Sequence, residues 1–229
     1  HYHRPESNEK LKYLLLFGDG SYDLKERYPV NTNRVLTFQS KESLSTVTSF
    51  ACDDFYGEMD AGEGLDAAGL IDIGIGRFPV TTVDQAKNAV DKCISYAKNS
   101  EETLGEWRNK ICLATDDGNG NTHFSQAEQV LAPLIQNLGP VYNVTKIYMD
   151  AFMQVSTPIG ERCPDANTAI NTAVENGLLV MNYTGHGGEI GWADESILTV
   201  PEIQSWTNFG KLPVFITATC EFSRYDDPE

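Results

Sequence analysis

The chain is organised around Leu178-Leu179-Val180-Met181-Asn182-Tyr183-Thr184-Gly185-His186-Gly187-Gly188, followed later by Leu212-Pro213-Val214-Phe215-Ile216-Thr217-Ala218-Thr219-Cys220. Each stretch contains a short apolar run, over residues 178–183 and 213–218, that is bounded by turn signals. Runs of this length and composition are typical of strands buried in a parallel sheet. A reactive side chain follows each predicted strand, His186 in the first case and Cys220 in the second.

Sites in open α/β sheets form outside the carboxyl ends of the strands, so two neighbouring strands would bring His186 and Cys220 face to face. A cysteine is a strong nucleophile as a thiolate, and a nearby imidazole lowers its pKa. The same imidazole can pass a proton to a leaving amine. The N–H groups of Gly187 and Cys220 are the candidate oxyanion hole. The pattern therefore predicts acyl transfer by a Cys–His pair, which needs no cofactor.

The motif over residues 182–188, with Ala218-Thr219-Cys220 after it, resembles the gingipain family of cysteine peptidases in the caspase-like group, and more narrowly the PorU-type C-terminal signal peptidase of the type IX secretion system. Residues 53–57 and 74–79 share the resemblance. It implies a caspase-like α/β fold, a mostly parallel sheet with helices on both faces. The predicted subdomains are an N-terminal α/β part over residues 1–100 and a catalytic part over residues 110–229, shortened at its C-terminal end.

The resemblance also implies a function. PorU-type proteins remove C-terminal secretion signals from exported cargo at the bacterial outer-membrane surface, and can join the new carboxyl end to lipopolysaccharide by transpeptidation. Protein or peptide substrates and secretion-system partners follow from this expectation. The alternatives are a secreted gingipain-like endopeptidase specific for Arg or Lys, a non-catalytic scaffold module of the secretion assembly, and a calcium-binding adhesion module.

A third residue is expected to orient the imidazole. Asp116 and Asp117 follow a predicted strand over residues 110–115. In the family an acidic residue stands here just before a glycine, which favours Asp117 over Asp116. His123, in the same loop, is expected to be an ordinary loop residue. An EF-hand-like calcium loop starting at Asp117 is a weaker alternative, because its sixth position is Thr122 rather than glycine and no helix precedes it.

The loop after His186 holds the candidate substrate contacts. Trp192 is a candidate wall of the specificity pocket, the alternative being a packed aromatic at the base of the loop. Glu189, Asp194 and Glu195 lie in the same loop. They either meet a basic substrate side chain or are exposed loop charges.

Composition narrows the class of partner. The chain has 229 residues and a net charge of −16, which argues against nucleic acid and favours cations or basic partners. No apolar run is long enough to predict a transmembrane segment. The acidic residues 52–66 suit structural Ca²⁺ near Asp53 and Asp54, and calcium sites are known in the resembled family. A solvated acidic loop is the alternative.

The remaining pattern alternates strands and helices, which indicates a mostly parallel sheet. Thr82 and Gln85 predict the start of a helix over residues 82–99, whose apolar residues are expected to pack in a core. A helix over residues 126–138 contains Pro133, which should kink or split it. Thr199 and Glu202 predict the cap of a short helix.

Overall fold

The fold comes from a computed structural model that describes residues 11–30, 32–41, 45, 48–64, 67, 69–222 and 224–227. The chain forms two compact units, His1–Asp91 with Arg224–Glu229 and Lys92–Ser223. The predicted division placed the boundary between residues 100 and 110 and kept the chain's end in the catalytic part. In the structure the division falls earlier, and the last residues belong to the first unit.

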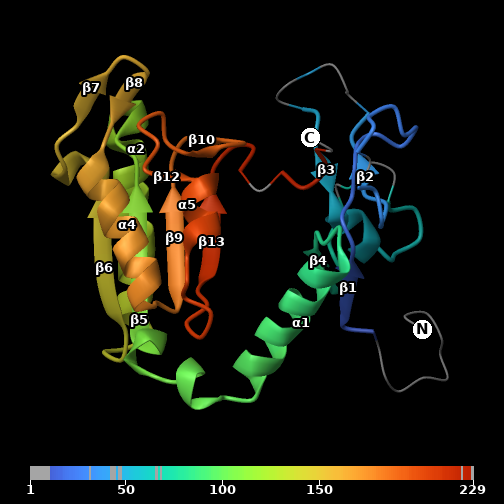
Figure 1. The fold of residues 1–229 in the computed structure, drawn as a ribbon, viewed down its shortest axis with the longest axis horizontal. Coiled ribbons are helices and arrows are strands. Elements are labelled where there is room, and N and C mark those ends of the chain that lie inside the picture. The colour runs from blue at the N-terminus through green and yellow to red at the C-terminus, as the bar shows by residue number, and fades with distance from the viewer. Residues whose placement is uncertain are drawn as a thin grey trace. The chain divides into compact units, whose positions relative to one another are not determined.

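The second unit is built on four parallel strands, β5 (Lys110–Thr115), β6 (Asn143–Tyr148), β9 (Val180–Thr184) and β13 (Val214–Ala218). Figure 1 shows them side by side in the order β13-β9-β5-β6. The strands follow the apolar runs of the sequence closely, and β5 occupies the predicted residues. The prediction of a mostly parallel α/β sheet is confirmed.

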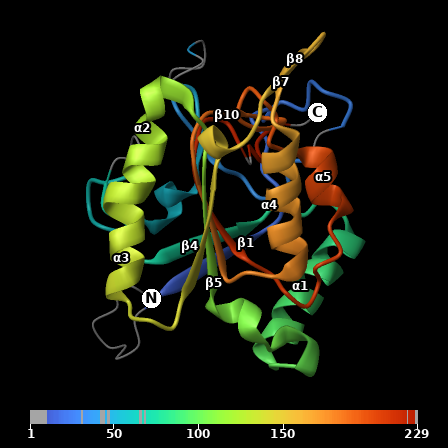
Figure 2. The ribbon, with the colours of Figure 1, turned by 90° about the vertical axis from the view of Figure 1, so that its left-hand side faces the viewer.

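Helices cover both faces of this sheet (Figure 2). One face carries α2 (Gly118–Gln126) and α3 (Ala132–Asn137), and the other carries α4 (Pro164–Asn176) and α5 (Val200–Ser205). Apolar residues fill the space on each side, with the larger cluster under α4. The sheet is therefore buried between two helical layers, as its apolar sequence requires.

The helix predicted over residues 126–138 starts earlier, so its predicted start is wrong: α2 begins at Gly118, passes through a left-handed turn over residues 119–121, and then continues as a right-handed helix. A π-helical segment η4 (Ala127–Leu131) separates α2 from α3, and Pro133 lies in the first turn of α3. Proline has no N–H to donate, so the ordinary helical ladder is interrupted at this point, as predicted. The capping box of Thr199 and Glu202 at the start of α5 is confirmed.

Short elements lie beyond the carboxyl ends of the strands. A small antiparallel sheet contains β10 (Gly187–Gly188), β11 (Gly191–Trp192) and β12 (Leu198–Thr199). A hairpin contains β7 (Val155–Thr157) and β8 (Gly160–Arg162). The 3₁₀ turns of this unit are η2 (Glu101–Thr103), η3 (Glu106–Asn109) and η5 (Met149–Ala151).

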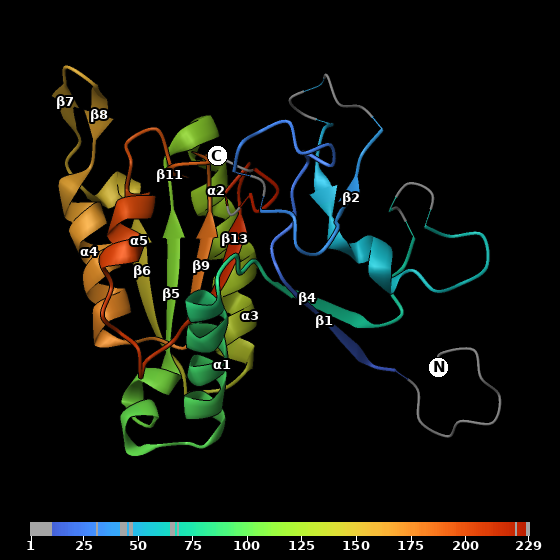
Figure 3. The same cartoon turned by 45° about the vertical axis from the view of Figure 1, so that its right-hand side comes forward.

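The first unit contains a parallel pair, β1 (Tyr13–Phe17) with β4 (Gly74–Phe78), shown in Figure 3. An antiparallel pair, β2 (Phe38–Gln39) with β3 (Ala51–Cys52), leads into the 3₁₀ turn η1 (Asp53–Gly57). Much of this unit is irregular, so polar side chains contribute strongly to holding its loops together.

The ion pair between Arg77 and Asp53 is the main such contact. Arg77 donates from Nε and Nη2 to the two carboxylate oxygens, at 2.6 and 2.8 Å, and the side chains are only 5% and 13% exposed. Its Nη1 donates to the backbone oxygens of Gly18 and Val35. Burial alone raises the pKa of Asp53, but hydrogen bonds from Arg77 and Thr37 outweigh it and hold the pKa below its usual value. One guanidinium thus joins three loops.

The linker helix α1 (Val83–Ala97) passes from the first unit into the second. Its predicted cap is confirmed, because Thr82 and Gln85 exchange hydrogen bonds of 3.2 Å between side chain and backbone. The expectation that its apolar residues pack in a core is wrong, since no residue of α1 is buried, and a helix between two units has no single core to face. None of the helices that the structure describes is both long and apolar enough to span a membrane.

We expect Arg77→Met to destabilise the first unit by about 3–5 kcal/mol, because it leaves the Asp53 carboxylate buried without its partner. The matched control is Lys146→Met, which removes an ion pair with Glu128 whose side chains are 40% and 32% exposed. That loss should be about 1 kcal/mol or less. Urea unfolding at neutral pH measures both.

The pH dependence gives a second readout. Because the folded-state pKa of Asp53 is lowered, its contribution to stability is complete above the unfolded pKa of about 4 and is lost as the pH falls through the lower folded value. Arg77→Met should remove that part of the acid-induced loss of stability. Equal destabilisation by the Arg77 and Lys146 variants would contradict the role given to Arg77.

Candidate active site

The order of strands brings the segments that carry His186, Cys220 and Asp116 to one edge of the sheet. Strand β9 lies between β13 and β5, and Thr184 at its end pairs with Ala218 on one side and Thr115 on the other. His186 and Cys220 each lie two residues beyond this paired row. The predicted juxtaposition of the two strand ends is therefore present in the fold.

Contacts beyond the paired row keep the two segments together. The Gly185 N–H donates to the backbone oxygen of Ala218 at 3.2 Å. A Cβ placed on Gly187 would lie 2.4 Å from Oγ1 of Thr219, so only glycine fits beside the residue that precedes Cys220. The residues on both sides of His186 thus touch the segment that leads to Cys220. Both His186 and Cys220 are exposed, and the thiol is free.

The backbone of His186 is held at both of its polar groups. Its N–H donates to Oδ2 of Asp116 at 2.5 Å. Its carbonyl oxygen accepts from the Tyr183 hydroxyl at 2.6 Å and from the Ala193 N–H at 2.8 Å. A functional side chain on such a fixed backbone needs little rearrangement before it acts.

The carboxylate against His186 belongs to Asp116 rather than Asp117. Asp116 is 3% exposed and also accepts from the Gly118 N–H at 3.2 Å. The Asp117 carboxylate instead accepts from Nε2 of Gln154 at 2.6 Å. The chain turns into α2 at Asp117, so its side chain leaves the strand in a different direction. Of the two predicted candidates, the structure brings the second, Asp116, to His186.

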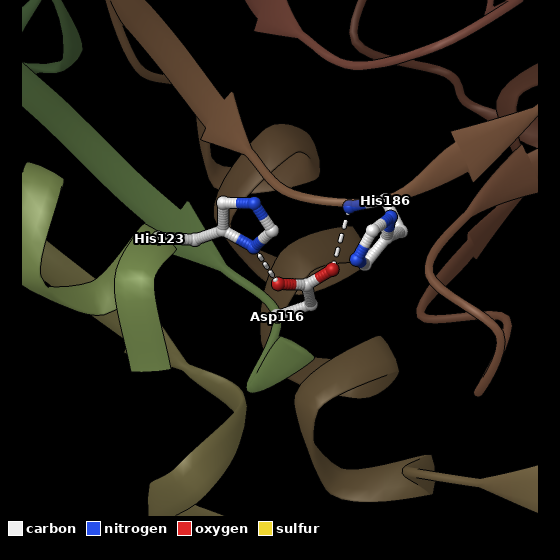
Figure 4. Close-up of side chains that lie close together, drawn as sticks. All are labelled: Asp116, His123 and His186. Atoms are coloured by element: carbon white, nitrogen blue, oxygen red, sulfur yellow. Dashed lines mark hydrogen bonds and ion pairs between the residues drawn. The ribbon is translucent and has the colours of Figure 1, made fainter. Parts of the chain in front are cut away.

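His123 joins the site, although the sequence indicated an ordinary loop residue. Its Nδ1 contacts Oδ1 of Asp116, and its ring meets the ring of His186 edge to face at 5.2 Å (Figure 4). Residues 119–121, Asn-Gly-Asn, take left-handed φ angles of 56°, 62° and 65°, which fold the loop back toward Asp116. Asn and Gly are the residues that tolerate this conformation, and that pattern is the signal in the sequence.

Trp192 is fully buried and does not line an open pocket. Its ring stacks on Tyr183 with centroids 4.3 Å apart, and Phe222 lies 5.6 Å away. It therefore packs the loop after His186 against the segment after Cys220. Gly187 pairs with Trp192 in the small antiparallel sheet. The role of the Gly187 and Cys220 N–H groups as oxyanion donors stays a prediction.

Carboxylates gather around this edge of the sheet. The pKa of Glu195 is raised, first by burial and then by the negative charges of Asp117, Asp194 and Asp116. Burial is the larger cause, but the carboxylates that contribute to the shift lie near Glu195 and add negative charge to this edge. This negative charge favours cations and basic side chains of a ligand.

Calcium near Asp53 and Asp54 stays a prediction, and the structure also brings together carboxylates elsewhere in the first unit. Asp53 is occupied by Arg77, whereas Asp60, Glu63 and Asp72 place carboxylate oxygens within 4.8 Å of one another. Among the described residues, Oε2 of Glu58 is buried without a hydrogen-bond partner. The carboxyl carbons of Glu58 and Glu63 both lie 3.2 Å from a Cβ built on Gly69. Oxygen donors in this number suit Ca²⁺.

Comparison with known proteins identifies the family. The family model described as Peptidase family C25 matches residues 1–229. The chain belongs to peptidase family C25. Gingipain R2 of Porphyromonas gingivalis is 25% identical over 172 residues, which are 73% of this chain and 21% of that protein. Lys-gingipain of the same organism is 26% identical over 153 residues, 67% of this chain and 8% of that protein.

The fold agrees with this assignment. The crystal structure of the Arg-specific cysteine proteinase gingipain R superposes with a TM-score of 0.58 at 22% identity, covering 93% of this chain and 42% of that one. The complex of the pro- and mature domains of RgpB from P. gingivalis gives a TM-score of 0.60. The predictions of a gingipain-type family and a caspase-like fold are confirmed. The chain spans less than half the length of these relatives.

We expect Asp116→Ala to destabilise the second unit by about 2–3 kcal/mol, because it leaves the N–H groups of Gly118 and His186 without an acceptor. Asp117→Ala is the matched control, since it removes a contact to Gln154 alone and should cost about 1 kcal/mol or less. Thermal and urea unfolding of the two variants measure the difference. A larger loss for Asp117→Ala would contradict the arrangement described.

Proposed function

We propose that this chain is the catalytic part of a cysteine peptidase that acts through Cys220 and His186. The observation that supports it most strongly is the parallel pairing of β9 with β13, which places the two residues at matching positions beyond neighbouring strand ends. Membership of peptidase family C25 supports the same chemistry. Both side chains are exposed, so a peptide can reach them.

In the proposed reaction the Cys220 thiolate attacks the carbonyl carbon of the scissile peptide bond, and a C–S bond forms. The Gly187 and Cys220 N–H groups stabilise the oxyanion. His186 gives a proton to the amine nitrogen as the C–N bond breaks, which leaves an acyl-enzyme thioester. His186 then takes a proton from water, which attacks the thioester and releases the acid and the thiolate.

Asp116 acts in this scheme as a positioning residue. Its carboxylate accepts a hydrogen bond from the backbone N–H of His186 rather than binding substrate. It therefore fixes the position of the His186 backbone, from which the imidazole extends. Asp117 stays the alternative orienter suggested by the family pattern. The two assignments differ in which variant loses activity more.

The negative field around Glu195 favours substrates with a basic side chain beside the cleaved bond. A structural relative is named as Arg-specific, which is consistent with cleavage after Arg or Lys. Removal of C-terminal secretion signals from exported cargo, at the outer-membrane surface and with secretion-system partners, is the narrower proposal. It is supported by the PorU-type resemblance of residues 53–57 and 74–79. Attack on the thioester by an amine instead of water gives transpeptidation with the same residues.

We expect Cys220→Ala to lower kcat/KM for peptide cleavage by a factor of about 10³ or more. Cys93→Ala is the control, because that thiol is also free and exposed but lies on α1. Fluorogenic peptides with Arg, Lys or Ala before the cleaved bond measure activity and preference together. Cleavage that survives Cys220→Ala would contradict the proposal, and an Ala preference would contradict the basic specificity.

We also propose that Ca²⁺ at the carboxylates of Asp60, Glu63 and Asp72 stabilises the first unit. Calcium at a hundred times its dissociation constant should add about 2.7 kcal/mol to the free energy of unfolding. Glu63→Gln should abolish most of that gain, whereas Glu106→Gln, in the second unit, should retain it. Melting curves with calcium and with chelator measure the effect, and an equal gain in both variants would contradict the site.

A further inference from the structure

A set of three metal-binding side chains lies at the active-site edge, and peptide cleavage does not require all of it. Asp116, His123 and His186 offer one carboxylate oxygen and two imidazole nitrogens, all within 4.8 Å of one another. Figure 4 shows the Asp116 carboxylate between the two rings. The three residues come from the end of β5, from α2 and from the loop after β9.

We propose that Asp116, His123 and His186 bind a divalent transition-metal ion of the zinc class, and that the bound ion reversibly inhibits the peptidase. Two imidazoles and one carboxylate form a common three-ligand set for such ions, with further coordination positions left for water. Ligand bonds of about 2.0–2.2 Å place neighbouring donor atoms about 3.4 Å apart, so the hydrogen-bonded atoms of Asp116 and His123 must separate slightly to admit an ion. Small rotations of the two rings provide that adjustment.

The carboxylate is already oriented for this purpose. Asp116 is 3% exposed and is held by backbone N–H groups of Gly118 and His186. Hydrogen bonds to a ligating carboxylate fix its direction and support metal affinity. The contact between Asp116 and Nδ1 of His123 marks where the ion would bind. The proton shared by these two groups would be displaced by the metal and released to solvent.

The turn that precedes His123 directs its side chain back toward Asp116. Asn119 and Asn121 hold left-handed backbone conformations on either side of Gly120. Each costs a non-glycine residue free energy, and such conformations concentrate at functional sites. The proposed peptidase mechanism uses only the imidazole of His186, so the cleavage steps themselves do not require the second imidazole that contacts the Asp116 carboxylate.

An ion can reach the three side chains. His186 is exposed, so the set opens to solvent on its side, while Asp116 closes it on the other. Asp117, Asp194 and Asp116 all lie close enough to raise the pKa of Glu195, and the negative charge of these carboxylates raises the local concentration of cations.

The inhibitory effect, which rests on the proposed function, follows from His186. A ring nitrogen bonded to the metal has no lone pair with which to carry a proton to the leaving amine or take one from water. Removing the ion with a chelator restores that lone pair. Inhibition should therefore be fully reversible and need no oxidation of Cys220.

The test is calorimetric titration of the full chain with ZnCl₂. The background is Cys220→Ser with His1→Ala and His3→Ala, because the thiol and the terminal His-x-His would bind zinc themselves. In excess CaCl₂, which occupies the proposed calcium site, one zinc site that depends on His123 is expected. His123→Ala should weaken binding at least tenfold, whereas Asp117→Asn should leave it within about twofold. Co²⁺ in place of Zn²⁺ should give visible d–d absorption without a thiolate charge-transfer band, and His123→Ala should remove that absorption.

Binding and activity are read separately. In protein with native Cys220, inhibition is measured as the ratio of activity in chelator to activity in ZnCl₂. The His123→Ala variant should show a ratio at least tenfold lower than that of the protein with His123. Absence of a zinc site, or a site that His123→Ala leaves unchanged, would overturn the inference while the peptidase proposal stands. Zinc binding that depends on His123, in a protein that cleaves no peptide, would support the site and contradict the proposed function instead.

Discussion

The structure depends on the parallel register of β9 with its two neighbours, β5 and β13. Thr184 ends β9 beside Thr115 and Ala218, so the three chains leave the sheet at one level. A slip of one residue in either pairing would turn every side chain of that strand to the opposite face. The apolar faces packed under α4 and under α2 and α3 oppose such a slip. Burial of the sheet thereby brings the strand ends that precede His186 and Cys220 to the same level.

The buried Asp116 carboxylate is the second constraint. A charge taken out of water is costly unless it is hydrogen-bonded. Here two backbone N–H groups and His123 supply partners, and one of those N–H groups belongs to His186. The need to satisfy this carboxylate therefore fixes the histidine loop. The same geometry gives the three residues their capacity to hold an ion.

The features set by local pattern were predictable from the sequence. The strands over residues 110–115 and 214–218, the capped start of α1 and the capping box of α5 follow from hydrophobic period and cap chemistry. The pairing of strand ends followed from the general rule for parallel sheets. The roles of Cys220 as nucleophile and His186 as proton carrier were inferred from the chemistry of a thiol and an imidazole, and the family resemblance agrees with them.

Features set by long-range packing were not predictable. Asp116 and Asp117 differ by one position, and the turn into α2 decides which one meets His186. His123 reaches the site only through three left-handed residues, and Trp192 is buried by Tyr183 and Phe222 rather than exposed to substrate. The exposed face of α1 follows from the division into two units, which periodicity does not reveal.

The register of β9 and β13 makes Cys220 and His186 a working pair only if the histidine activates the thiol. The rate of Cys220 alkylation by iodoacetamide at neutral pH, measured by mass spectrometry in wild type and in His186→Ala, tests this. Cys220 of the wild type should react faster than Cys93, and His186→Ala should remove the difference. Equal rates for Cys220 and Cys93 in the wild type, or a Cys220 rate that His186→Ala leaves unchanged, would contradict the pairing.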